Sequence, residues 1–266
     1  MPRSLPIFDE DDPVWREAAK ALFVVWATRT GRRLRHVPVA QLSAWELEDF
    51  WADDQLDDVP RPRPTHKALV AVDIVAFGAP GRDTRIQIRL RESMYTQVER
   101  ALGATGLTLS DCHHEDRGDG AFIVAPGDAD PCDLLDPFAH DLAAHLRREN
   151  RDAGPDLRLR LRAAVHYGHV DHDAHGVVGR APVDLFRHLE APAFRRAMAE
   201  TPSADLGVIV SDSLFREAGH RDGRVDHDAY RPIRVRVKET RTRAWLWLPP
   251  ARPGDPDGRL LDPAGA

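Results

Sequence analysis

The fold is decided by the stretch "KALVAVDIVAFG", residues Lys67–Gly78. It has the apolar composition of a buried β-strand, but a single acid, Asp73, interrupts it. A carboxylate in apolar surroundings has to be paired, protonated or bound to a cation. We therefore expect a buried strand that carries one functional or paired acid.

A second acidic stretch, "HHEDRGDGAFIVAP", spans His113–Pro126. Its turn around Arg117-Gly118-Asp119-Gly120 joins two predicted strands, about 107–113 and 121–124, and would bring Asp119 beside Asp73. Two carboxylates and a backbone carbonyl such as that of Ile74 form a hard oxygen site suited to Mg²⁺ or Mn²⁺. The glycines of the turn allow close approach of a phosphate. In the alternative interpretation, Asp119 only serves the turn and Asp73 only lies near a strand end.

The rest of the main domain alternates between helical and strand patterns. The sequence predicts helices at about 84–102, 133–150 and 183–199 (the last broken at Pro192), strands at 157–168, with one wet face, and 206–215, and a hairpin at 233–248. The resulting order β, α, β-hairpin, α, β, α, β, β-hairpin predicts an α+β fold in which helices cover an antiparallel-rich sheet.

Four segments are expected. Residues 1–57 form a small N-terminal helical appendage, 58–66 a Pro-rich linker, 67–248 the main domain and 249–266 a disordered, Pro/Gly-rich tail. Two helices alone make little core, so the appendage is expected to pack on the main domain or on a protein partner.

Composition excludes several classes of protein. The chain has 266 residues, of which 42% are hydrophobic and 30% charged, and its net charge of −6 argues against nucleic-acid binding. No apolar run approaches the roughly 18 residues of a membrane span. Only two cysteines, Cys112 and Cys132, are present, so a reducing cytoplasm is expected.

The two acidic motifs carry a resemblance. "VAVDIVAFG" followed by "HEDRGDGAFIVA" resembles the catalytic domain of class III nucleotidyl (adenylate/guanylate) cyclases, within an actinobacterial cyclase-like branch; the match covers about 66–248. The resemblance implies a ferredoxin-like cyclase homology domain that works as a homodimer. It further implies conversion of a nucleoside triphosphate to a 3′,5′-cyclic nucleotide and pyrophosphate.

The resemblance also implies roles for single residues. Asp73, Asp119 and the carbonyl of Ile74 would hold two Mg²⁺ or Mn²⁺ ions. Glu115 would select the base: a glutamate suits the donors of guanine, and a pyrimidine base stays open as an alternative. Gly118 would lie against the substrate, and Lys238 would contact the triphosphate.

The sequence departs from the family on the helix that should carry an Asn for the ribose and an Arg for the transferring phosphate. Without gaps, Val183 takes the Asn place and Arg187 the Arg place. Shifted by one, the pair becomes Asp184 and His188. The ungapped register keeps a cation and is preferred, and in both registers the Asn is missing. Losing one such donor typically lowers the rate by about 10²–10³-fold.

Three hypotheses therefore remain. The first is an active cyclase, the second a degenerate cyclase domain that senses nucleotides or binds proteins, and the third another metal-dependent phosphodiester-bond enzyme. A zinc site on the histidines spaced by three (His166, His169, His172, His175) is the less favoured interpretation of a segment expected to form a hairpin.

Overall fold

The computed structural model describes residues 65–173, 176–219 and 225–249. The predicted N-terminal appendage, all but the end of the linker and nearly all of the predicted tail lie outside the described residues. No helix in the described ranges is both long and apolar enough to span a membrane.

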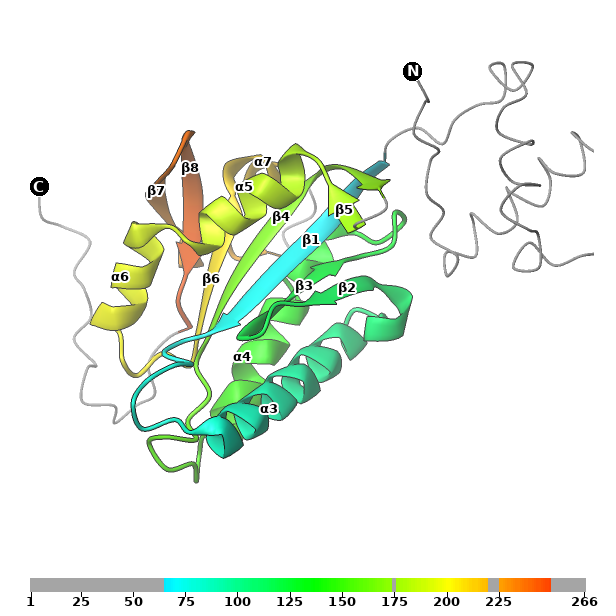
Figure 1. Cartoon of the computed structure of the whole chain (residues 1–266). Coiled ribbons are helices and arrows are strands. Elements are labelled where there is room, and N and C mark those ends of the chain that lie inside the picture. The colour runs from blue at the N-terminus through cyan, green and yellow to red at the C-terminus, as the bar shows by residue number, and fades with distance from the viewer. Residues whose placement is uncertain (1–64, 174–175, 220–224, 250–266) are drawn as a thin grey trace, which may run out of the picture. The chain divides into compact units, whose positions relative to one another are not determined.

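The described part is built on a mixed sheet (Figure 1). Its strands are β1 (Thr65–Ile74), β2 (His113–Asp116), β3 (Gly120–Val124), β4 (Leu161–Asp173), β5 (Gly176–Val178), β6 (Leu206–Ser211), β7 (Arg231–Val237) and β8 (Thr240–Trp247). The spatial order is β2-β3-β1-β4-β6-β8-β7, and among these pairs only β4 and β6 run parallel. The predicted α+β fold with an antiparallel-rich sheet is confirmed.

The hairpin Asp171–Val178 falls outside the compact unit formed by Thr65–Val170 and the chain from Gly179 onward. Within this hairpin, Asp171 pairs with Val178 and Asp173 with Gly176. A hairpin was predicted here, so this prediction is confirmed.

Helices cover both faces of the sheet. The helices are α3 (Thr84–Gly103), α4 (Phe138–Glu149), α5 (Arg180–Leu189), α6 (Pro192–Glu200) and α7 (Asp212–Gly219). Side chains of α3, α4 and α7 share one core cluster with Val70 and Val72 of β1, whereas α5 packs on β1 from the other side (Figure 1). Leu69 and Ala71, which point away from that cluster, are also fully buried. Covering on both faces explains why β1 is almost continuously apolar.

Four predicted elements were wrong in extent, and one of them, the strand predicted at 157–168, is β4, Leu161–Asp173. Residues 107–112 are not a strand, because Thr108 and Asp111 form a capping box around a 3₁₀ turn at Leu109–Asp111. The helix predicted from 133 begins only at Phe138, after Pro137, which has no N–H to donate. The strand predicted to continue through 215 ends at Ser211, where α7 starts. The predicted break at Pro192 is confirmed, since this residue opens α6.

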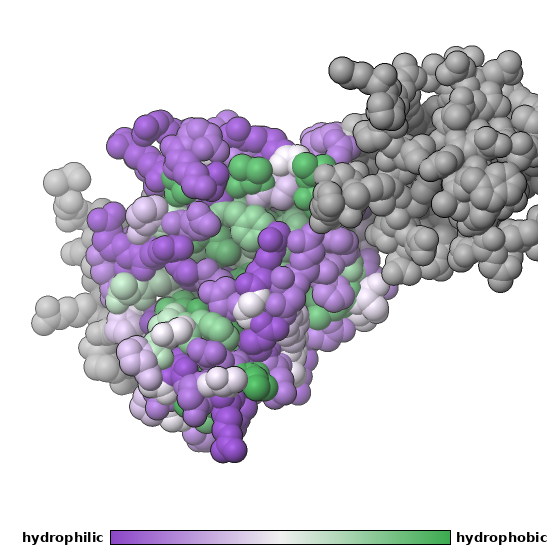
Figure 2. Space-filling model, in the orientation of Figure 1, coloured by the Kyte–Doolittle hydropathy of each residue, from purple (hydrophilic) through white to green (hydrophobic). Residues whose placement is uncertain are grey.

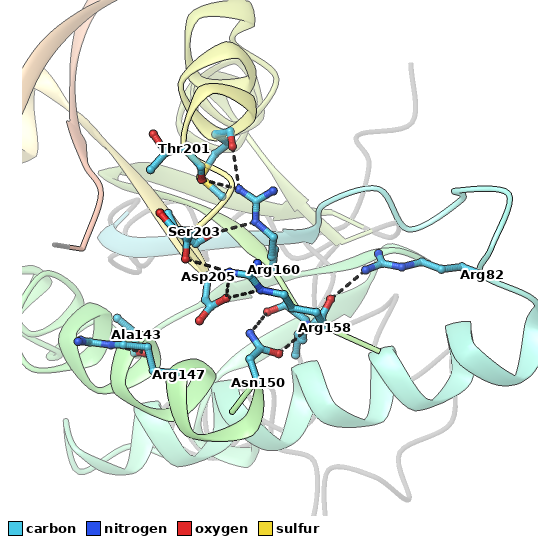
Figure 3. Close-up of polar contacts among 12 residues, drawn as sticks. Arg82, Ala143, Arg147, Asn150, Arg158, Arg160, Thr201, Ser203 and Asp205 are labelled. Carbon is cyan, nitrogen blue, oxygen red and sulfur yellow. Dashed lines mark hydrogen bonds and ion pairs between the residues drawn. The ribbon is translucent and has the colours of Figure 1, made fainter. Parts of the chain in front are cut away.

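The prediction that the arginines of "LRLRLR", residues 157–162, form a solvent-exposed face was also wrong. Arg158 donates to the Asp205 carboxylate at 2.8 and 3.0 Å (Figure 3). Arg160 donates to three carbonyls at the end of α6 and just after it, those of Met198, Thr201 and Ala204, at 2.7–2.9 Å. Carbonyls at a helix end lack partners within the helix, so these arginines anchor the α6–β6 connection.

Candidate active site

Backbone pairing holds the two predicted acids together. Asp73 lies opposite Gly120 in the β1–β3 register, and the N–H of Ile74 donates to the carbonyl of Asp119 at 2.8 Å. A Cβ on Gly120 would meet the Val72 carbonyl at 2.1 Å, so a side chain there would push the strands apart. Gly118 has a φ of +82°, which suits glycine in this tight turn. The turn therefore sets Asp119 beside the end of β1.

Asp73 has a partner that the sequence did not reveal. Arg162 of β4 lies directly opposite and donates to both carboxylate oxygens, at 2.8 and 2.6 Å. The side chains of Arg162 and Asp73 are only 14% and 15% exposed. Burial raises the pKa of Asp73, the contact with Arg162 opposes this, and the nearby charge of Asp119 adds to the rise. The acid in the apolar strand is thus a paired carboxylate.

The Asp119 carboxylate is exposed, and its charge acts on both Arg91 and Asp73. Each carboxylate oxygen of Asp73 keeps a second lone pair beyond its bond to Arg162. In the described part of the chain, no cluster of three or more His, Cys, Asp or Glu side chains could hold a metal. The two carboxylates with the Ile74 carbonyl fit a hard cation such as Mg²⁺, which keeps waters and phosphate oxygens among its ligands.

Arg82 fixes the loop that follows Ile74. It donates to the carbonyls of Val75 and Ala76 at 2.8 and 3.0 Å and to that of Asp156 at 3.1 Å. It also donates to the carbonyl of Arg158 at 2.9 Å (Figure 3). Burial lowers the pKa of Arg82. One guanidinium therefore ties the loop beside the acids to the segment before β4, a role that only the tertiary structure shows.

Asp116 holds the β2–β3 turn against α3. Its carboxylate accepts from the N–H of Gly118 at 2.7 Å and from the hydroxyl of Tyr95 at 2.9 Å, and it also pairs with Arg91. These contacts, Arg91 first, lower the pKa of Asp116 to about 2. Asp116 is a turn acid that sequence reasoning did not single out, although an Asp two residues before a Gly is a local turn signal.

Glu115 lies on β2 opposite Phe122. Its two carboxylate oxygens are paired separately, one with His113 Nε2 at 3.1 Å and the other with the Arg117 guanidinium at 3.0 Å. The predicted base-selecting residue is thus half-buried and already paired within the hairpin.

The other predicted residues gather at α5 and the β7–β8 turn. Arg187 donates to Glu239 at 3.4 Å, and the hydroxyl of Thr240 donates to Asp184 at 3.5 Å. Lys238 lies exposed in the same turn, with a φ of +50°. In Figure 1 this turn is at the top, whereas β1 ends at the lower left. In one copy, the predicted site residues at the end of β1 therefore lie apart from those at the β7–β8 turn.

The burial of side chains on α5 distinguishes the two registers, Val183 with Arg187 and Asp184 with His188. His188 is 3% exposed, and its Nδ1 meets the carbonyl of Asp184. Arg187 lies at the helix edge next to the turn, and Val183, one turn earlier, is 40% exposed. Of the two candidate cations, His188 is buried, whereas the Arg187 side chain is 16% exposed and lies next to the turn, so the structure favours Arg187.

The histidine series does not form one cluster among the described side chains. His166 stacks on His188, with ring centres 6.1 Å apart, while His169 meets His66 at 5.9 Å. The prediction that His166 and His169 face opposite sides agrees with these separate neighbours. The side chains of His172 and His175 lie outside the described residues.

No protein-family model and no curated protein matches the chain. Among solved structures, it is similar to an adenylate/guanylate cyclase/hydrolase from Silicibacter pomeroyi, with a TM-score of 0.48 and 17% identity over 70% of this chain and 98% of that one. It is similar to the guanylyl cyclase Cya2, with a TM-score of 0.49 and 15% identity over 73% and 95%.

A third similar structure is the guanylate cyclase domain of RhGC from Catenaria anguillulae in complex with GTP, with a TM-score of 0.45 and 14% identity over 71% and 98%. By name, these three structures are adenylate or guanylate cyclases or a domain of one.

Proposed function

We propose that the described domain is a metal-dependent nucleotidyl cyclase that converts a nucleoside triphosphate to a 3′,5′-cyclic nucleotide and pyrophosphate. The observation that carries this proposal is the 2.8 Å bond from the Ile74 N–H to the Asp119 carbonyl, together with the Asp73–Gly120 pairing. These contacts bring the backbones of Asp73 and Asp119 together at one end of β1, which supports a site where their carboxylates hold a nucleotide's metal-bound phosphates.

Asp73, Asp119 and the Ile74 carbonyl would hold the ions, and bound Mg²⁺ or Mn²⁺ lowers the pKa of a ribose hydroxyl and neutralises phosphate charge. The chain's own residues do the rest. Arg162 fixes the orientation of the Asp73 carboxylate through two bonds. Arg187 and Lys238 supply positive charge for the phosphates, and Glu115 accepts hydrogen bonds from the base.

The active form would be a homodimer. In Figure 1 the β7–β8 turn beside Arg187 lies apart from the end of β1, which supports a second copy supplying Arg187 and Lys238 to the acids of the first. Apolar side chains gather in the middle of the face shown in Figure 2, between α5 and α3. Exposed apolar surface of this kind commonly marks an interaction site, which supports pairing of two copies.

The test is to incubate the full chain with ATP, GTP, CTP or UTP and Mn²⁺ and to identify products by mass spectrometry. A cyclic product is expected, and it should disappear in Asp119→Asn. Asp128→Asn is the matched control, because Asp128 is an exposed acid on the loop after β3. Absence of a cyclic product with all four nucleotides would refute the proposal.

A degenerate domain that binds nucleotides without turnover is the second candidate. The observation that favours it is at α5, where Asp184 replaces the expected Asn in one register and Val183 in the other. Arg187 is moreover engaged with Glu239 and Glu190, at 3.4 and 3.8 Å. Nucleotide binding in calorimetry without any cyclic product would establish this candidate instead.

A further inference from the structure

Arg117, in the turn between β2 and β3, lies between a carboxylate and two aromatic rings. One of its terminal nitrogens is 3.0 Å from Glu115 Oε2. Its guanidinium carbon is 4.8 Å from the centre of the Phe186 ring and 5.7 Å from that of Phe122. The two rings are 5.4 Å apart. A planar cation thus fills the space between the carboxylate and the aromatic surface.

This space is assembled from two elements. Glu115 and Phe122 are cross-strand partners on the β2–β3 hairpin, so their side chains share one face. Phe186 reaches the same place from α5. Phe122 is 1% exposed, which makes it the floor of the space, while Phe186 and Arg117 lie nearer the surface. Glu115 is held from the other side by His113 at 3.1 Å.

The chemistry of this arrangement matches one class of base. The edge of guanine presents an N1–H and an N2 amino group, two donors on a flat ring, and the guanidinium of arginine presents the same pattern. A carboxylate binds either group through parallel hydrogen bonds, and an aromatic ring stacks on either. Adenine offers a single amino donor beside an acceptor nitrogen, which a carboxylate repels.

We propose that Arg117 occupies the base position of this site and competes with guanine for Glu115. The inference rests on the proposed function, in which Glu115 contacts the base. A guanine nucleotide displaces the Arg117 side chain, bonds Glu115 through its two donors and stacks on Phe186. Arg117 therefore sets the affinity for guanine nucleotides and lowers it relative to an open site.

The contacts of Arg117 are weak enough for displacement. Its side chain is 47% exposed, and its ion pair with Glu115 is solvent-accessible. Exposed ion pairs and exposed cation–π contacts each stabilise only modestly. Removing the Arg117 side chain is accordingly expected to increase the affinity for guanine nucleotides by about five- to tenfold.

The experiment measures binding of GDP and ADP to the full chain by calorimetry, in the presence of Mg²⁺. Arg117→Ala should raise the ratio of GDP to ADP affinity by about five- to tenfold over the wild type. Using the ratio cancels the general loss of one positive charge near the phosphates. In the Glu115→Gln background the same substitution should leave the ratio unchanged, because the carboxylate that both groups compete for is gone.

Two results would overturn the inference: a GDP/ADP ratio that Arg117→Ala leaves unchanged or lowers, or no GDP binding by Arg117→Ala. Because the Arg117 side chain is 47% exposed, Arg117→Ala should fold like the wild type, and an unfolding curve checks this. Arg241→Ala is the matched control, since Arg241 is an exposed arginine on β8 and should not change the ratio. Because the readout is binding, failure of the wild type to form a cyclic product would refute the proposed function alone.

Discussion

Arg162 faces Asp73 across the β1–β4 pair and holds both of its carboxylate oxygens, although the two residues are 89 positions apart in the chain. The pair is largely buried. A buried ion pair of this geometry stabilises little when intact, but removal of one partner leaves an uncompensated charge. The acid that marks the candidate site is therefore also expected to matter for stability.

Arg162→Gln should lower the free energy of unfolding by about 3 kcal/mol at pH 7, because the Asp73 carboxylate would stay buried without its cation. Urea unfolding measures this. Millimolar Mn²⁺ should restore part of the loss if the two acids bind the ion, since a divalent cation then supplies the missing charge.

Arg216→Gln is the matched control for Arg162→Gln. Arg216 also pairs with an aspartate, Asp212, but its side chain is 64% exposed, so its loss should change stability by less than about 1 kcal/mol. Equal effects of the two substitutions would show that the Arg162 pair is no more than a surface contact.

The sequence was informative about the acids because Asp73 breaks an apolar strand and Asp119 sits in a glycine turn, and both are local signals. It could not predict Arg162 as a partner, because alternation in "LRLRLR" assigns the arginines to a solvent face. Their carboxylate and carbonyl partners lie on segments brought close only by the sheet order. Long-range pairing of this kind leaves no trace in a local pattern.

The position of the α5 side chains was equally hidden from the sequence. The register of "VDLFRHLE" left Arg187 and His188 as competitors for one role. Once α5 starts at Arg180, His188 falls on the same face as the buried Leu185 and Leu189, and Arg187 falls beside the β7–β8 turn. The capping box at Thr108, in contrast, is a local motif that could have shown that the strand does not begin before His113.

Gly120→Ala should both destabilise the domain and impair the site. The added methyl would meet the Val72 carbonyl at 2.1 Å, so β1 and β3 must separate where they position Asp119. We expect a loss of about 2–3 kcal/mol in urea unfolding. Gly103→Ala is the control, because its Cβ would meet nothing within 4 Å at the end of α3. That control should be neutral or stabilise by about 0.5–1 kcal/mol. Similar losses in both variants would contradict the close approach at Gly120.

Stability should fall in mild acid because His166 is buried as a neutral imidazole. Burial, and then the neighbouring His188, lowers the pKa of His166 to about 4, while the charge of Asp184 acts in the opposite direction. Burial lowers the pKa of His188 as well. The unfolded chain, with a histidine pKa near 6.5, binds the proton first. The stabilisation that the neutral, buried His166 gives the folded state is therefore complete above about pH 6.5 and is lost as the pH falls toward 4.

At pH 5 the free energy of unfolding of the wild type should be about 2 kcal/mol lower than at neutral pH because of His166. Urea unfolding at pH 7.5 and pH 5 tests this with His166→Leu, in which the difference between the two pH values should shrink by about that amount. His114→Gln, a change at an exposed imidazole, should retain the wild-type difference. An unchanged pH dependence in His166→Leu would rule out this origin.

Mixing two inactive variants tests whether the site is shared between copies. Asp119→Asn removes an acid of one group, and Arg187→Ala removes the cation of the other. In a dimer whose sites take one group from each copy, a mixed pair contains one site with both losses and one intact site. An equimolar mixture should therefore regain about a quarter of the wild-type rate of cyclic-nucleotide formation, since about half of the dimers are mixed. No recovery, although size-exclusion chromatography and a tagged pull-down show that mixed dimers form, would mean that each copy builds its site from its own residues.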